Sequence, residues 1–260
     1  MFTVNHFIWL FISLVIIIVS VVLLNKYKPE LNKVLSVAVI GAVLSEFTRA
    51  FSLMHLIPST DGMMNIPFVE LHNLPFHLCS VQVLLILFTR FAKEGPIRTA
   101  VLAFMYPTCA VGAFIALFIP IIFTDDIDVS QAFTHPIAYQ YFLWHSLLII
   151  LGIYIAISKQ VDIQRKHCLT TIGILFGMAM ISLYLNSWMA MPTYRNGELI
   201  SVDYTPNFFF TYKPPIPFEF TEIWQWYIYF IILVAVVCIV ALIFYFPFFK
   251  KNSNRAEEDR

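Results

Sequence analysis

Long runs of apolar residues dominate the chain, and short polar segments separate them. A run of about 20 apolar residues is long enough to cross the hydrocarbon core of a bilayer as a helix. Seven runs are long enough to span, at residues 7–24, 34–57, 74–91, 97–123, 137–158, 169–191 and 224–248. The pattern predicts an all-α polytopic membrane protein, with seven transmembrane helices in residues 1–249 and a charged tail at residues 250–260.

The composition of the chain agrees with this prediction. Of its 260 residues, 60% are hydrophobic and 12% are charged, whereas soluble domains carry about 25% charged residues. The formal net charge is +0, so charge gives no indication of nucleic acid as a partner. The four cysteines lie in or beside apolar runs and form no Cys-x-x-Cys pair, so we expect neither a disulfide framework nor a cysteine metal site.

Lysine and arginine gather in alternate connections between the runs. The intervening connections contain Arg195 and Lys213 only. Since cytoplasmic loops carry an excess of Lys and Arg, we predict that the N-terminus lies outside and the C-terminus in the cytoplasm. The basic residues on the predicted cytoplasmic side are Lys26, Lys28, Lys33, Arg90, Lys93, Arg98, Lys159, Arg165, Lys166, Lys250, Lys251, Arg255 and Arg260.

The connection from residue 192 to residue 223 is unusually apolar for an outer loop. Its segment Asn207–Phe220 reads Asn-Phe-Phe-Phe-Thr-Tyr-Lys-Pro-Pro-Ile-Pro-Phe-Glu-Phe. Two interpretations remain open. The segment forms an aromatic belt at the membrane surface, or it folds back over the helices as a lid.

The start of the third run concentrates polar groups where they are costly in hydrocarbon. Asn73 is expected to cap this helix and Pro75 to occupy its first turn, which places Cys79 about one turn inside. Gln82 follows one turn later on the same face. His77 would point away from Cys79 on a helix, so a base for Cys79 has to come from another span.

Other polar residues fall in the outer halves of neighbouring spans. His145 in the fifth span is the best candidate for the base, since intramembrane histidines are commonly functional. Asn186 in the sixth span either contributes to the site or provides hydrogen bonds between helices. Glu46 and Arg49 are spaced to meet on one face of the second span, and we expect a structural ion pair.

The segment Leu74-Pro75-Phe76-His77-Leu78-Cys79 resembles the Leu-Pro-x-His-x-Cys signature of the YwaF-type bacterial membrane proteins. Their animal relative is transmembrane protein 164, which is regarded as an acyltransferase that remodels phospholipids through a cysteine. His145, Asn186 and the segment from Asn207 to Pro214 also fit the pattern. The resemblance implies that Cys79 accepts the acyl group and that His145 is its base. It also implies the plasma membrane of a bacterium.

The first functional hypothesis is therefore a membrane-embedded lipid acyltransferase or acyl hydrolase. Cys79 would attack the ester of a membrane phospholipid and His145 would act as base, without a cofactor. His77, Gln82 or Asn186 would bind the substrate or donate hydrogen bonds to the oxyanion. The supporting residues would be Glu46, Arg49 and Asn207.

Two alternatives remain. Residues His72, His77, His135 and His145 would supply ligands for a zinc-dependent membrane hydrolase, but no His-Glu-x-x-His spacing supports a metal site. The other alternative is a non-enzymatic small-molecule transporter or a receptor-like membrane protein. The spans lack inverted repeats and paired glycine-broken helices, which disfavours transport. Protein partners stay unknown at this point.

Overall fold

The computed structural model describes residues 2–58, 63–120, 122–125, 127–195, 198–204, 206–215 and 218–258. The chain divides into two compact units, which we describe separately. The first unit contains Met1–Glu70 and Leu78–Ile163. The second unit contains Leu71–His77 and Gln164–Arg260.

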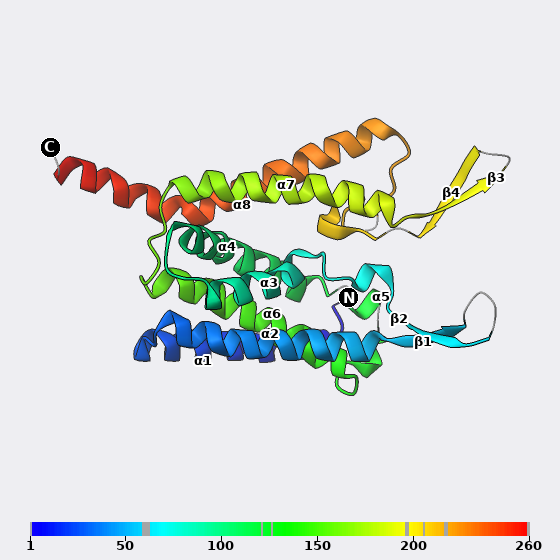
Figure 1. Ribbon diagram of the computed structural model, residues 1–260, viewed down its shortest axis with the longest axis horizontal. Helices are drawn as coiled ribbons and strands as arrows, with labels where there is room; N and C mark the ends of the chain where they lie inside the picture. Colours follow the sequence, from blue (N-terminus) through cyan, green and yellow to red (C-terminus); the bar gives the residue numbers. More distant parts are fainter. Residues whose placement is uncertain are drawn as a thin grey trace. The chain divides into compact units, whose positions relative to one another are not determined.

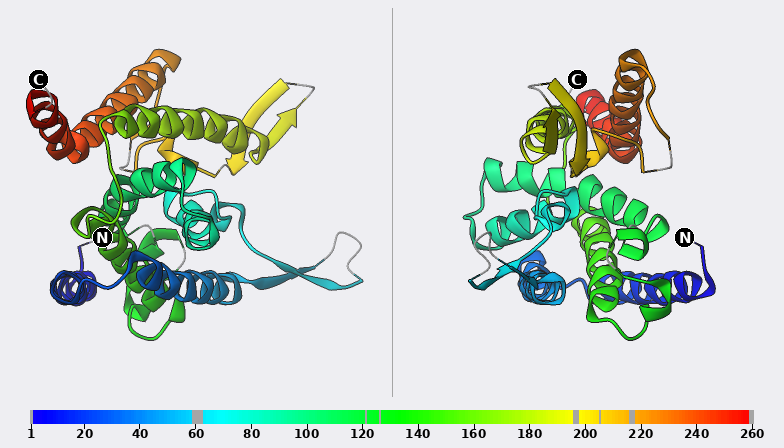
Figure 2. Two further views of the ribbon diagram at one scale, coloured as in Figure 1. Left: turned by 60° about the vertical axis from the view of Figure 1, so that its left-hand side comes forward. Right: turned by 90° about the vertical axis from the view of Figure 1, so that its right-hand side faces the viewer.

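The first unit is a bundle of helices with a short β-hairpin at one end (Figure 1). Its long helix α6 packs against α1, α2 and α4, and α3 packs against α2 and α4, as the turned views show (Figure 2). The strands of the hairpin, β1 and β2, pair antiparallel. The elements are α1 (Val4–Tyr27), α2 (Leu31–Leu53), β1 (His55–Pro58), β2 (Asn65–Phe68), α3 (Leu78–Phe91), α4 (Pro96–Phe118), α5 (Ile122–Asp125), the 3-10 turn η2 (Val129–Gln131) and α6 (Pro136–Ile157).

Close approach of backbones holds the centre of this bundle together. Gly152 of α6 lies directly against the backbone of α4, because a Cβ atom placed on it would stand 2.9 Å from the carbonyl oxygen of Tyr106. The same Cβ would stand 3.0 Å from the backbone nitrogen of Ala110. Small residues permit such contacts between membrane helices, where dispersion rather than water exclusion drives association.

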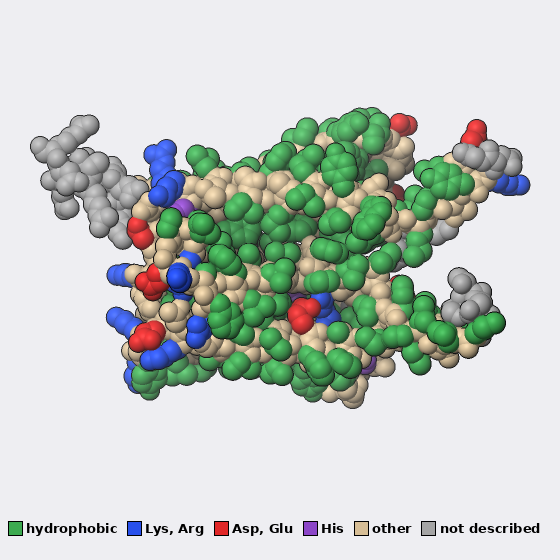
Figure 3. All heavy atoms as spheres, in the orientation of Figure 1, with side chains coloured by type: hydrophobic (Ala, Val, Ile, Leu, Met, Phe, Trp, Pro, Cys, Tyr) green, Lys and Arg blue, Asp and Glu red, His purple; other side chains and the backbone are tan. Residues whose placement is uncertain are grey.

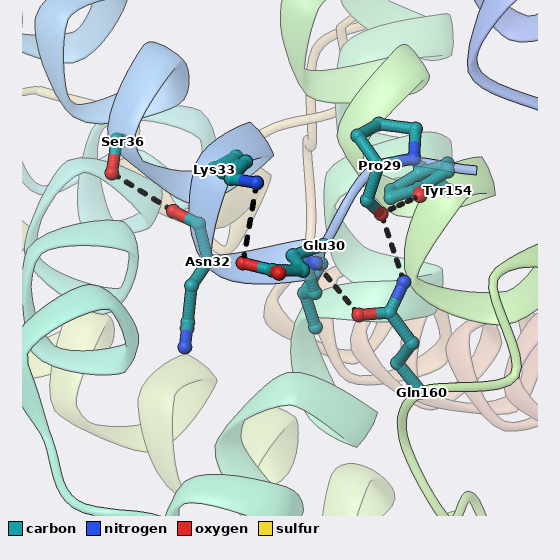
Figure 4. A network of polar contacts seen from close by, with 8 residues as sticks. Pro29, Glu30, Asn32, Lys33, Ser36, Tyr154 and Gln160 are labelled. Atoms are coloured by element: carbon teal, nitrogen blue, oxygen red, sulfur yellow. Dashed lines mark hydrogen bonds and ion pairs between the residues drawn. The ribbon is translucent and has the colours of Figure 1, made fainter. Parts of the chain in front are cut away.

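Hydrogen bonds join the helix ends opposite the β1–β2 hairpin. The carbonyl of Pro29 accepts from the Tyr154 hydroxyl and, at 2.9 Å, from Nε2 of Gln160 (Figure 4). Oε1 of Gln160 accepts from the backbone N–H of Leu31 at 2.7 Å. The connection between α1 and α2 is thereby fixed to the end of α6.

Basic side chains gather at this end of the first unit (Figure 3). Arg90 near the end of α3 donates from Nε to Oγ of Ser36 at 2.6 Å. Arg98 near the start of α4 donates to the carbonyl oxygen of Thr89 at 2.7 Å and to Oδ1 of Asn32 at 2.5 Å. The first and third connections, which the sequence predicts on one side of the membrane, therefore meet at one end of the unit.

The second unit consists of two long helices and the segments around them. Helices α7 and α8 contact one another, and α7 also contacts the 3-10 turn η3. A second antiparallel hairpin, β3–β4, follows α7. The elements are η1 (Leu71–Asn73), α7 (Lys166–Trp188), β3 (Met191–Arg195), β4 (Glu198–Tyr204), η3 (Phe208–Phe210) and α8 (Ile223–Glu258).

The predicted spans agree with this architecture in part. In the described residues, six helices are long and apolar enough to cross a membrane: Val4–Tyr27, Leu31–Leu53, Pro96–Phe118, Pro136–Ile157, Lys166–Trp188 and Ile223–Phe249. The chain is thus a mostly helical, multi-pass membrane protein. The third run contains the shorter apolar helix α3. The two hairpins were not predicted from the sequence, which was interpreted as helices and loops alone.

The start of the third helix was predicted wrongly. Helix α3 begins at Leu78, so Asn73 does not cap it and Pro75 is not in its first turn. Asn73 instead ends the 3-10 turn η1, and the N–H of Leu74 donates to the carbonyl of Leu71 at 3.2 Å. An apolar run indicates which residues avoid water, but it does not indicate at which residue the helix begins.

The contact at Gly152 leads to the first prediction. Gly152→Ala should lower the unfolding temperature of the purified protein, because the added methyl group overpacks the α4–α6 contact at a cost of about 1–3 kcal/mol. Gly173→Ala on α7 is the matched control, since its Cβ would meet nothing within 4 Å. The control should unfold at the same temperature or higher, because alanine favours helix. Equal melting of both variants would show that Gly152 does not control this packing.

Candidate functional site

Cys79 is the second residue of α3, nearer the helix start than the sequence predicted. Its side chain is half-buried and its thiol is free. A Cβ placed on Gly112 of α4 would stand 3.5 Å from the Cys79 sulfur and 3.3 Å from Cδ2 of Leu78. The thiol therefore lies against α4 at a position where α4 carries no side chain.

Gln82 lies one turn further along α3 and is fully buried. Its Nε2 donates to Oγ1 of Thr108 at 2.9 Å, and its Oε1 accepts from the Cys109 sulfur at 3.2 Å. Thr108 in turn donates to the carbonyl of Phe104 at 2.7 Å. The amide of Gln82 thus holds α3 against α4 and sets the position of the turn that carries Cys79.

His145 of α6 is buried, and one of its ring nitrogens has a defined partner. Nδ1 lies 2.6 Å from the carbonyl oxygen of Tyr141. A carbonyl only accepts, so Nδ1 carries the proton of the neutral ring and Nε2 carries the lone pair. The ring of Tyr141 lies 4.4 Å from the imidazole, centroid to centroid. The imidazole is thereby held in the tautomer that accepts a proton at Nε2.

Contacts on both sides of His145 give its level along α4. On one side, the Tyr141 hydroxyl donates to the carbonyl of Ala116 on α4 at 2.7 Å. On the other side, Gly152 packs against the backbone at Ala110 of α4. His145 therefore lies beside this segment, which includes Gly112. Cys79 and His145 thus flank the same two turns of α4, although among the described residues no hydrogen bond joins their side chains.

Asn186 is fully buried in the second unit, where it fastens a loop to α7. Its Oδ1 accepts from the N–H of Phe208 at 2.9 Å. Its Nδ2 donates to the carbonyl of Phe208 at 3.2 Å and to Oγ1 of Thr211 at 2.9 Å. Ser182 Oγ lies 2.9 Å from the same Oγ1. The amide nitrogen therefore donates to two atoms of this loop, and its oxygen accepts from a third.

The loop that Asn186 holds contains an unusual backbone. Phe209 and Phe210 have φ angles of 58° and 54°, a left-handed conformation that costs about 1–2 kcal/mol for a residue with a side chain. Asn207 bridges the loop, because its Oδ1 accepts from the N–H of Tyr212 at 3.1 Å and its Nδ2 donates to the carbonyl of Lys213 at 2.8 Å. These bonds agree with the supporting role predicted for Asn207.

Helix α8 binds the same loop from its first two turns. Trp226 Nε1 donates to the carbonyl of Thr211 at 3.0 Å, and the Tyr229 hydroxyl donates to the carbonyl of Phe210. Residues 207–213 are therefore held in place by side chains of two helices. Sequence reasoning identified Asn186 and Asn207 but missed Thr211, Trp226 and Tyr229, since nothing in their spacing marks them as partners.

His77 lies outside helix α3, so the argument that it points away from Cys79 on a helix does not apply. It belongs to the second unit, where its ring packs edge-on against Phe208 with centroids 5.0 Å apart. Phe76 makes a similar contact with Phe208 at 5.4 Å. The residues before Cys79 are thus packed against the loop that Asn186 holds.

The remaining predicted residues are the ion pair and the metal candidates. Nη2 of Arg49 lies 2.6 Å from Oε2 of Glu46, which confirms their pairing. Within the part of the chain that the structure describes, no group of three or more His, Cys, Asp and Glu residues is arranged to hold a metal ion. The side chain of His72 lies outside the described residues.

These features define a class of polytopic helical membrane protein with a half-buried cysteine and an oriented histidine beside one helix. The model of the TMEM164 family matches residues 1–245, so the chain belongs to that family. This confirms the relation to transmembrane protein 164 that the Leu-Pro-x-His-x-Cys segment indicated. No curated protein and no solved structure matches the chain.

The network around Asn186 leads to the second prediction. Asn186→Leu should increase the amide hydrogen exchange of residues 206–213, because it removes the hydrogen bonds that hold a strained backbone, each worth about 0.5–1.5 kcal/mol. Hydrogen exchange with mass spectrometry measures the change. Ser187→Ala, an exposed neighbour on α7, is the control and should leave the exchange unaltered. Unchanged exchange in Asn186→Leu would mean that other contacts order the loop.

Proposed function

We propose that this protein is a membrane-embedded lipid acyltransferase or acyl hydrolase, with Cys79 as nucleophile and His145 as base. The observation that supports it best is the bond from His145 Nδ1 to the Tyr141 carbonyl. It leaves Nε2 as the basic nitrogen, on a side chain that flanks the same turns of α4 as the Cys79 thiol. A nucleophile and an oriented base at one level are what acyl transfer requires.

The reaction proceeds in two steps. His145 takes the thiol proton, and the sulfur of Cys79 attacks the ester carbonyl carbon of a phospholipid. A C–S bond forms, the C–O bond breaks, and the leaving alcohol takes the proton from the imidazolium. His145 then removes a proton from an acceptor alcohol or water, whose oxygen attacks the thioester carbonyl carbon. A C–O bond forms, the C–S bond breaks, and the Cys79 thiolate takes the proton back from the imidazolium.

The oxyanion of each tetrahedral intermediate needs hydrogen-bond donors. The N–H groups at the start of a helix have no intrahelical acceptors, and Cys79 lies in the first turn of α3. These backbone donors are the best oxyanion site, with His77 as a further donor or substrate contact. Gln82 and Asn186 act by positioning, since their amides are bonded to Thr108 and to the Phe208–Thr211 loop.

We further infer seven spans, with α3 as part of the third. Helix α3 has 14 residues, or about 21 Å of helix, against a hydrocarbon core of about 30 Å. The irregular segment Leu71–His77 completes this crossing. Non-helical backbone at membrane depth is tolerated where protein surrounds it or where it lines a polar cavity, which suits a reactive site at Cys79.

We infer the orientation from the sequence, and the basic end of the first unit supports it. Arg90 and Arg98 of the third connection bond there to residues at the start of α2, and loops rich in Lys and Arg stay in the cytoplasm. In this proposal the N-terminus and the start of α3 lie on the outer side. The basic residues of the tail place the C-terminus in the cytoplasm in the same proposal. The membrane is the plasma membrane of a bacterium, by resemblance to the YwaF-type proteins.

The mechanism predicts that Cys79→Ser and His145→Ala abolish lipid remodelling. Removing the nucleophile should reduce the rate at least about a thousandfold, and removing the base about 100- to 10,000-fold. Purified protein in phospholipid vesicles is assayed by mass spectrometry for released and transferred acyl chains. Hydroxylamine should release an acyl group trapped on the wild-type protein and none from Cys79→Ser.

Cys238→Ser is the matched control for this experiment, because Cys238 is a half-buried thiol on α8 that takes no part in the mechanism. It should keep wild-type activity. Full activity of both Cys79→Ser and His145→Ala would exclude the mechanism.

The proposed orientation predicts which introduced cysteines an impermeant maleimide can label from outside the cell. In a Cys79→Ser background, a cysteine replacing Lys93 should react with an impermeant maleimide only after cells are opened. A cysteine replacing Met63, between β1 and β2, should react in intact cells. The reverse pattern would show that the N-terminus is cytoplasmic.

A further inference from the structure

Cys109 is a buried thiol on α4 that the proposed chemistry does not use. Its side chain is fully enclosed in the first unit, and its sulfur donates to Oε1 of Gln82 on α3 at 3.2 Å. On the α6 side, a Cβ placed on Gly152 would stand 3.2 Å from the Cβ of Cys109. A buried cysteine is commonly an inert apolar filler, so a function for Cys109 requires a reactive group beside it.

The packing of α3 on α4 brings Cys79 beside this thiol. The two helices pack against each other (Figure 2) and are antiparallel, because the short connection 92–95 reverses the chain. The Cys79 sulfur lies against Gly112 of α4. Three residues further along α3, Gln82 meets Cys109, which precedes Gly112 by three residues. Cys79 and Cys109 therefore occupy neighbouring turns of the same helix contact.

Helix geometry keeps the two thiols close. Residues three apart on a helix have Cβ atoms about 5–6 Å apart, which applies to Cys109 and the Cβ position of Gly112. The Cys79 sulfur is 3.5 Å from that same Cβ position, and Gly112 contributes no side chain to the space between them. The charge of one thiolate also acts on the other thiol. Since a disulfide needs Cβ atoms about 3.5–4.5 Å apart, a small shift of the first turn of α3 would join the sulfurs.

Exposure decides which thiol an oxidant reaches first. Cys79 is half-buried, whereas Cys109 is enclosed. In the proposed orientation Cys79 lies toward the outer side, where conditions favour disulfides. The other two cysteines, Cys168 and Cys238, belong to the second unit. Cys168 follows Lys166 at the start of α7, on the proposed cytoplasmic side, where thiols are kept reduced.

We propose that Cys79 and Cys109 form a reversible disulfide when a hydroperoxide oxidises Cys79, and that this bond switches the nucleophile off. The disulfide itself is independent of the proposed function, whereas its effect on lipid remodelling rests on that function. The α3–α4 contact is then a redox modification site as well as a packing contact.

The oxidation proceeds in two steps. With hydrogen peroxide, the Cys79 sulfur attacks one oxygen, the O–O bond breaks, an S–O bond forms, and the leaving oxygen takes the thiol proton as water. The Cys109 sulfur then attacks the sulfur of Cys79 sulfenic acid. An S–S bond forms, the S–O bond breaks, and the released hydroxide takes the Cys109 proton as water. The peroxide gains the two electrons that the thiols lose.

Gln82 favours the return to the reduced state. Its Oε1 accepts the Cys109 thiol proton in the reduced protein, and Cys109 has no proton to donate in a disulfide. A buried acceptor that loses its donor is unfavourable. A dithiol such as dithiothreitol therefore breaks the disulfide by thiol–disulfide exchange, and is itself oxidised, while the bond to Gln82 forms again.

The disulfide is tested on the full-length protein in detergent. After treatment with hydrogen peroxide, free thiols are blocked with N-ethylmaleimide and peptides are analysed by mass spectrometry. The wild type should give a peptide pair linked through Cys79 and Cys109, lighter by two hydrogen atoms than the separate peptides and absent after dithiothreitol. Cys109→Ser should give no linked pair and a dimedone adduct of Cys79 instead. Serine keeps a hydroxyl donor for Gln82, which preserves the fold.

Cys168→Ser is the matched control, because it removes another buried thiol, from α7. It should form the linked pair in the same amount as the wild type. In the lipid-remodelling assay, peroxide should stop the wild type and Cys109→Ser alike. Dithiothreitol should restore the wild type only, because sulfenic acid without a resolving thiol is oxidised further to sulfinic acid, which thiols do not reduce.

Three outcomes would overturn the redox pair: no oxidation of Cys79 by peroxide, oxidised Cys79 without a link to Cys109 in the wild type, or equal recovery of the wild type and Cys109→Ser. A linked pair in a protein that remodels no lipid would support the disulfide and count against the proposed function. The two proposals therefore fail in different measurements.

Discussion

The structure depends on one constraint, which is that polar atoms within a membrane must find partners inside the protein. The side chains that satisfy it also fix the register of the helices. Gln82 joins α3 to α4 through Thr108, and Gln140 joins α6 to α2 through Ser45. In the second unit Thr171 Oγ1 lies 2.9 Å from the Tyr245 hydroxyl and joins α7 to α8. Apolar packing alone would leave these helices free to slide.

Helix α4 is the element against which the candidate chemistry is aligned. Two helices contact it at defined points: α3 through the Gln82 amide and the side chains of Leu78 and Cys79 at Gly112, and α6 through Gly152. Gly152 brings the backbone of α6 against that of α4, and Gly112 leaves room on α4 for the side chains of Leu78 and Cys79. Cys79 and His145 therefore both lie beside the same short segment of α4. A shift of α3 or α6 by a fraction of a turn would change their separation, so the tight packing of α4 determines the geometry of the pair.

The sequence predicted the membrane architecture because its signal is strong and local. Every one of the seven apolar runs contains a helix, and the spacing of Glu46 and Arg49 was enough to predict their contact. The start of α3 was predicted wrongly because Asn73 and Pro75 are residue types that commonly cap a helix and occupy its first turn. In the structure Asn73 instead belongs to the 3-10 turn Leu71–Asn73. Local residue preference fits both structures equally well.

Features that depend on distant partners could not be predicted. His145 bonds to the carbonyl of Tyr141, four residues earlier on the same helix. The spacing of the two residues does not show which ring nitrogen makes this bond, so the tautomer of His145 could not be predicted. The role of Asn186 depends on Thr211 and Phe208, which lie in a loop with no periodic pattern. The left-handed residues Phe209 and Phe210 are improbable by propensity, and only the surrounding bonds make them favourable.

The membership of Leu71–His77 in the second unit has a consequence for biogenesis. Its contact with Phe208 forms only after α7 and the aromatic loop have been synthesised and inserted, although Cys79 itself enters the membrane much earlier. Chains fold as they emerge, with N-terminal parts first. The residues in front of Cys79 therefore reach their final packing late, and a chain that ends before the aromatic loop would lack the contact between His77 and Phe208.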